Sequence, residues 1–141
     1  MKKKIILGIA VLAVVFQFIP YGKEHTNPPV LSIVKWDSPR TEQLFANACK
    51  DCHSNETKWP WYSNIAPISW LVQSDVDEGK SKFNISMIGH QRKNELDDAA
   101  KEVIGGDMPF WPYLIAHKEA RLSASETQEL INGLKATFKE D

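Results

Sequence analysis

The sequence predicts an all-α fold, and three observations support this class. Apolar residues recur at helical spacing in several segments, helix-start signals precede those segments, and runs with the alternation of a β-strand are few. The chain has 141 residues, which is about the length of one domain. We therefore expect a single helical core.

The composition excludes several classes of protein. With 43% hydrophobic and 25% charged residues the chain is typical of a globular protein. It has 17 basic and 18 acidic residues, and three of the basic ones are Lys2, Lys3 and Lys4. The rest of the chain is therefore acidic, which argues against nucleic acid as a partner.

The N-terminus has the pattern of an export signal. Lysines at positions 2–4 precede an apolar run over residues 5–19. Residues 16–21 are too bulky for a signal-peptidase site, so we expect the segment to stay as an inner-membrane anchor over residues 5–21, with the domain on the periplasmic side. As a helix this anchor would reach about 26 Å, slightly less than a hydrocarbon core of roughly 30 Å. The alternative is a cleaved signal and a soluble product.

Three parts follow from this reading: a signal or membrane anchor over residues 1–22, an extended tether over 23–36, and a domain over 37–141. Pro28 and Pro29 forbid helix in the tether and favour an extended conformation. We expect the tether to hold the domain off the membrane.

The first helix of the domain has a clear start, with Ser38 as N-cap and Pro39 at the first helical position. Its apolar stripe is Leu44, Phe45 and Ala48. The helix leads directly into Cys49.

A Cys-x-x-Cys-His motif occupies residues 49–53. Two thiols on one helical turn, Cys49 and Cys52, can add to the two vinyl groups of a single haem, and His53 can then bind the iron as proximal ligand. These are the only two cysteines in the chain, so a structural zinc site lacks its second ligand pair. A thioredoxin-like redox pair would need alternating strands and helices, and a short-loop disulfide in an exported protein remains an alternative. We expect one covalent haem c.

Aromatic residues cluster just after the motif. Trp59, Trp61 and Tyr62 can supply apolar walls for a haem, and N–H or O–H donors for its propionates. The alternative is that they are ordinary core aromatics.

The stretch Ala-Cys-Lys-Asp-Cys-His-Ser-Asn-Glu-Thr-Lys-Trp-Pro-Trp-Tyr at residues 48–62 resembles the bacterial haem-binding domain family of c-type cytochromes. Further segments resemble that family's pattern in order: residues 75–80, 83–86, Met108-Pro109, Tyr113, His117 and Leu122-Ser123. The resemblance extends from about residue 28 to the C-terminus. It implies an exported, haem-binding single domain, often tethered to a membrane.

A haem of this kind needs a sixth ligand, and the candidates are Met87, Met108, His90, His117 and His25. We favour Met108. A glycine pair before it can end a helix over residues 94–104 in a left-handed cap, a proline follows it, and Met-Pro resembles the ligand loop of cytochrome c folds. Ligation by His90 or His117 stays open, as does a plain core role for the methionine.

Two further helices complete the expected cytochrome c-like domain. One opens at Pro67 or Ser69, and Gly79 lies just past its end. The last has a capping box at Ser123 and Glu126 and an apolar stripe of Leu130, Ile131, Leu134 and Phe138. By analogy with cytochrome folds, this helix should pack on the first, with Phe45 against Leu134 or Phe138.

Two strong axial ligands would leave no open coordination site, so we expect an electron carrier rather than an enzyme. Its acidic surface suits transient docking to a basic patch on an unidentified redox partner. A haem sensor with a displaceable Met108 is one alternative. Another is a structural subunit whose haem conducts electrons within a larger complex.

Overall fold

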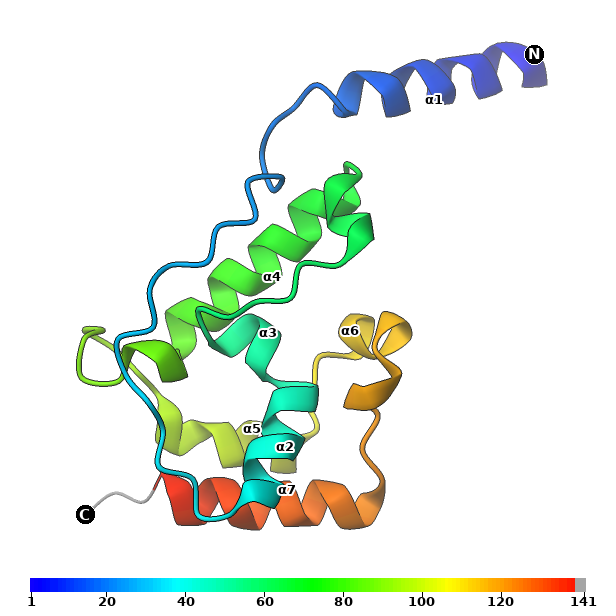
Figure 1. Cartoon of the computed structure of the whole chain (residues 1–141). Coiled ribbons are helices and arrows are strands. Elements are labelled where there is room, and N and C mark those ends of the chain that lie inside the picture. Colours follow the sequence, from blue (N-terminus) through cyan, green and yellow to red (C-terminus); the bar gives the residue numbers. More distant parts are fainter. Residues whose placement is uncertain (139–141) are drawn as a thin grey trace.

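The computed structural model describes residues 1–138, and every regular element in that range is helical (Figure 1). The all-α prediction is therefore confirmed. In chain order the elements are α1 Lys2–Phe16, α2 Pro39–Ala48, α3 Lys50–His53, η1 Trp61–Asn64, α4 Ile68–Lys82, η2 Ile85–Met87, η3 Leu96–Asp98, α5 Ala99–Gly105, α6 Trp111–Ala116, η4 Lys118–Ala120 and α7 Ala124–Thr137.

Both predicted helix starts are confirmed. The Ser38 side chain accepts a hydrogen bond from the Thr41 amide at 3.2 Å, and Pro39 opens α2. At α7, Ser123 and Glu126 form the reciprocal capping box. These signals act within one turn of chain, so the sequence alone places them correctly.

The core lies where α2 and α5 pack against α7 (Figure 1). Its largest fully buried side chains are Leu44, Phe45, Leu130 and Leu134. The predicted packing of α7 on α2 is confirmed, and Trp36 adds to it. The Trp36 ring lies 5.0 Å from that of Phe45 and 5.8 Å from that of Phe138, so it joins the two helices.

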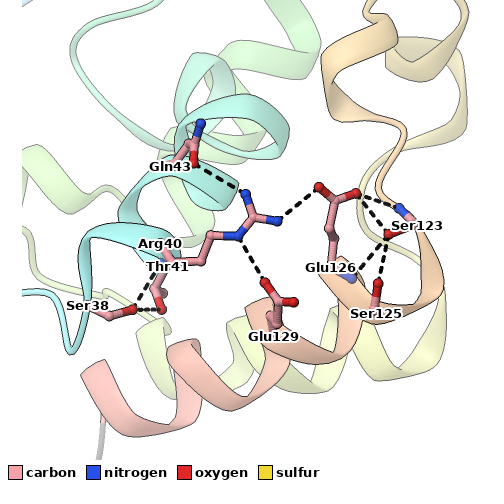
Figure 2. A network of polar contacts seen from close by, with 8 residues as sticks. All are labelled: Ser38, Arg40, Thr41, Gln43, Ser123, Ser125, Glu126 and Glu129. Carbon is pink, nitrogen blue, oxygen red and sulfur yellow. Dashed lines mark hydrogen bonds and ion pairs between the residues drawn. The ribbon is translucent and has the colours of Figure 1, made fainter.

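The surface of the α2–α7 crossing carries a polar network (Figure 2). Arg40 on α2 donates to Glu126 at 3.0 Å and to Glu129 at 2.9 Å, both on α7. All three side chains are substantially exposed, so the pairs add little stability beyond the packing below them.

Three predicted helix ends differ from those observed. The apolar N-terminal helix ends at Phe16, not Tyr21: the amides of residues 17–19 bond to carbonyls three residues back instead of four, and Pro20, which has no amide donor, follows. The helix expected to end just before Gly79 continues to Lys82. The helix expected over residues 94–104 is a 3₁₀ turn followed by α5, whose left-handed cap at Gly106 (φ 81°) is as predicted. Within residues 1–138, no helix is both long enough and apolar enough to cross a membrane.

Residues 23–36 contain no helix and lie along the domain (Figure 1). Asn55 donates to the Pro29 carbonyl at 2.8 Å. The amides of Leu31 and Ser32 donate to the Ser86 carbonyl at 2.9 and 3.1 Å. Hydrogen bonds to groups distant in sequence make this segment part of the folded unit, a feature that local composition does not reveal.

Candidate cofactor-binding site

The Cys-x-x-Cys-His motif is closed into a single helical turn. Cys49 ends α2, where its amide donates to the Phe45 carbonyl at 2.8 Å. The amides of Cys52 and His53 then donate back to the Cys49 carbonyl, at 3.2 and 3.0 Å. Both cysteines are free thiols and half-buried. The structure thus brings the three predicted attachment residues together on α3 and the residue before it.

Burial dominates the acid–base chemistry of the two thiols. It raises the pKa of Cys49 to about 12, with a smaller contribution from the nearby Cys52. Burial likewise raises the pKa of Cys52 to about 12, and the charge of Asp51 adds to the effect. Both sulfurs are therefore neutral thiols near pH 7.

His53 is 6% exposed, and its surroundings orient the imidazole. Its Nδ1 lies 3.2 Å from the Phe83 carbonyl oxygen, which can only accept, so Nδ1 donates and Nε2 carries the lone pair. The Phe83 ring stacks on the imidazole at 3.9 Å and 9°. Burial lowers the pKa of His53, although the carbonyl groups of Phe83 and Gly79 oppose this shift. A neutral, oriented imidazole is the form that ligates a metal ion.

Gly79 allows α4 to lie directly against the motif. A Cβ at this position would lie 2.6 Å from the Cys52 carbonyl oxygen and 2.9 Å from the Cys52 Cβ. The close approach places the end of α4, and hence Phe83, over His53. From the sequence, Gly79 was expected to mark the end of a helix, and Phe83 had no expected role. The roles of both residues become visible only where α3 and α4 cross.

Asp51, inside the motif, connects it to the neighbouring chain. Its carboxylate accepts from the Lys58 amide at 3.0 Å and from the Tyr113 hydroxyl at 2.8 Å. Tyr113 belongs to α6, so this bond joins α3 to the helix after Met108. Burial, followed by the charge of Asp51, raises the pKa of Tyr113, which keeps the hydroxyl protonated as a donor.

The three aromatic residues predicted near the cofactor have different settings. Trp59 stacks on His25 at 4.7 Å, and its Nε1 donates to Asn27 at 3.3 Å. The Tyr62 hydroxyl lies 3.0 Å from Nε2 of His117. Trp61 is 76% exposed. Trp59 and Tyr62 thus remain candidates for a pocket wall, whereas little protein covers Trp61.

Of the sixth-ligand candidates, Met108 packs on the core cluster that Cys49 also borders, and it is half-buried. His117 uses both ring nitrogens, since Nδ1 donates to Glu119 at 3.2 Å and Nε2 can accept from Tyr62. His25 contacts the Ser63 carbonyl through Nε2 at 3.1 Å, and His90 is exposed. Met87 lies on η2 and is half-buried.

The donor set fits haem c: two thiols three residues apart and a neutral imidazole with Nε2 available. Two hollows in the structure, of about 130 and 440 Å³, are bordered mainly by residues 30–36 and by chain near α2 or α7, and neither borders Cys49, Cys52 or His53. Within residues 1–138 no cluster of three or more His, Cys, Asp or Glu side chains could hold a metal ion.

A family model described as a haem-binding domain matches residues 11–136. The match includes the second half of the apolar N-terminal segment and all of the extended segment, in accord with the packing of residues 23–36 on the domain. Neither the curated proteins nor the solved structures contain a match.

Proposed function

This chain belongs to the haem-binding domain family, and on that premise we propose that it is an exported c-type cytochrome with one covalent haem that carries single electrons. Thioether bonds would form from Cys49 and Cys52, and His53 would be the proximal ligand. The observation that carries this proposal is the hydrogen bond from Nδ1 of His53 to the Phe83 carbonyl. It leaves Nε2 as the ligating atom, one residue from a thiol.

When bound, a haem supplies an iron that accepts and releases one electron. The chain's own residues set the conditions for this chemistry. The Phe83 carbonyl holds the His53 imidazole in one tautomer, and the stacked Phe83 ring prevents it from rotating. The low-dielectric setting of the buried imidazole favours its neutral form. Trp59 and Tyr62 are the aromatic residues best placed to cover the macrocycle.

Met108 is our proposal for the sixth ligand. It lies on the same core border as Cys49, whereas hydrogen bonds occupy both ring nitrogens of His117, and His90 is exposed. A histidine–methionine pair would give the iron a relatively high potential and leave no open position. Electron transfer between proteins then needs only a docking surface, and the acidic balance of the chain suits a basic patch on a redox partner.

Export and membrane attachment complete the proposal. Helix α1 is apolar around its whole circumference, its side chains are exposed, and three lysines stand at its start. A helix that is apolar on all sides is stable in an apolar medium. We therefore propose that the bilayer takes up α1, although this helix is too short to cross a membrane by itself, and that the rest of the chain lies on the periplasmic side.

The decisive experiment is a pyridine haemochrome spectrum of protein produced with a c-type maturation system, after denaturation and acid–acetone extraction. Haem that stays with the polypeptide and shows the spectrum of two saturated vinyl groups is the expected result. Loss of all haem on extraction would refute covalent attachment. Carbon monoxide should bind the reduced protein slowly and incompletely, since fast and complete binding would favour the sensor.

A further inference from the structure

Four large apolar side chains, Trp61, Ile65, Ile68 and Leu71, are exposed close together along the chain, and we call them the apolar patch. These side chains are 76%, 43%, 45% and 64% exposed. They belong to η1, the turn after it and the first turn of α4. No charged residue occurs anywhere in residues 59–74. A grouping of large apolar side chains without charges marks an interaction surface.

The same end of α4 holds the end of α1 (Figure 1). The Gln17 amide bonds to both backbone groups of Ala66, donating to the carbonyl at 2.8 Å and accepting from the N–H at 3.1 Å. The ring of Phe16 lies 5.2 Å from that of Trp70. Gly22 approaches the Ser69 carbonyl so closely that a Cβ would overlap it. The exit of α1 is therefore fixed relative to the patch, which it adjoins.

We propose that the patch of Trp61, Ile65, Ile68 and Leu71 rests on the lipid bilayer that takes up α1, as a second membrane contact that sets the orientation of the domain. This inference rests on the proposed membrane attachment through α1. Lipid is favoured as the occupant because the patch continues from an all-round apolar helix. Its tryptophan also has the amphipathic ring that prefers the membrane interface.

The consequence is a fixed height for the cofactor motif. Gly79, which contacts Cys52, lies eight residues after Leu71 on α4, or about 12 Å along the helix axis at 1.5 Å per residue. With α4 steadied at its first turn, the attachment site would keep a constant distance from the bilayer surface and a constant orientation toward a partner.

The test uses the full-length, haem-loaded protein in phosphatidylcholine vesicles that contain a phosphatidylcholine with a diazirine near the glycerol. After illumination, lipid-modified peptides are mapped by mass spectrometry. We expect lipid adducts in α1 and also within residues 61–71. Adducts confined to α1 would overturn the patch while leaving the anchor intact. The absence of adducts in α1 would overturn the membrane attachment itself.

Variants make the assignment specific. Leu71→Asp should remove most adducts from residues 61–71 and leave those in α1 unchanged, with the helical circular dichroism and haem spectrum serving as folding checks. Ile104→Asp on α5 is the matched control, since Ile104 is 56% exposed and α5 packs on α7. This control variant should leave the lipid adducts in α1 and in residues 61–71 unchanged. Equal labelling of α5 and residues 61–71 in the wild type would contradict the proposal.

Discussion

Gly79 shows at the scale of a single residue how the motif is positioned. The α3 turn and α4 meet with backbone almost against backbone, and a Cβ would lie 2.6 Å from the Cys52 carbonyl oxygen. The neighbouring atoms are backbone and Cβ, which cannot move aside as the end of a flexible side chain could. A glycine inside a helix lowers the stability of that helix, but its lack of a Cβ allows α4 to contact the motif closely.

We expect Gly79→Ala to lower the free energy of unfolding by about 1–3 kcal/mol, the usual cost of overpacking. Chemical denaturation monitored by circular dichroism measures this change in the free energy of unfolding. Gly8→Ala is the control, because a Cβ at Gly8 meets nothing within 4 Å. Equal stability of Gly79→Ala and the wild type would show that α3 and α4 can separate without cost.

Met108 is the second residue whose role can be isolated. Met108→Ala should leave the covalent haem in place, because attachment depends on Cys49 and Cys52. It should also lower the reduction potential and shift the visible spectrum toward high spin, since the thioether would be lost. Met87→Ala, which removes a half-buried methionine from η2, should change neither. An unchanged spectrum in Met108→Ala would exclude this residue as ligand.

At the scale of elements, the contact between α2 and α7 forms a large part of the hydrophobic core. Gly133 on α7 faces Thr41 on α2 so closely that a Cβ would overlap the threonine side chain, and buried Leu44 and Leu134 lie in the core cluster of the two helices. Arg40, Glu126 and Glu129 join the helices at the surface (Figure 2). Packing supplies the stability of this contact, and the exposed charges adjust its dependence on pH.

Glu126 provides a pH test of this crossing. Hydrogen bonds from the Ser123 backbone and side chain, and then from Arg40, lower its pKa. The resulting stability is fully present above the ordinary glutamate pKa of about 4.3 and is lost as pH falls through the lower folded value. Between about pH 6 and pH 3, Glu126→Gln should therefore lose less thermal stability than the wild type.

The matched control for this test is Glu102→Gln, which neutralises an exposed glutamate on α5. Its acid-induced loss of thermal stability should equal that of the wild type. If Glu126→Gln and the wild type lost stability in parallel, the capping box and the Arg40 pair would not contribute to the pH dependence.

At the scale of the whole molecule, a buried amide network joins the N-terminal extended segment to the rest of the domain. Asn55 donates to the Pro29 carbonyl at 2.8 Å and accepts from the Asn84 amide at 2.8 Å. The backbone N–H of Asn55 donates to the Ser86 hydroxyl at 3.0 Å. Three regions far apart in sequence thus meet at one buried side chain.

Asn55→Ala should lower the free energy of unfolding by about 1–3 kcal/mol, because it leaves the buried side-chain donor of Asn84 without a partner and removes the bond to the Pro29 carbonyl. It should also speed proteolysis within residues 23–36. Urea denaturation measures the free energy of unfolding, and mass spectrometry identifies the cleavage sites. Asn64→Ala, which removes an exposed bond to the Trp61 carbonyl, is the control. Unchanged cleavage would mean that residues 23–36 are held by other contacts.

The sequence by itself determined the helical class, the starts of α2 and α7 and the cap at Gly106, and it contains the Cys-x-x-Cys-His motif on which the proposed attachment rests. Each depends on residues within about one turn of one another, so local chemistry suffices. The tertiary structure decided where α4 ends, the docking of residues 23–36, and the Phe83 carbonyl that orients His53. These features arise where distant segments cross, and no local pattern records which backbones will meet.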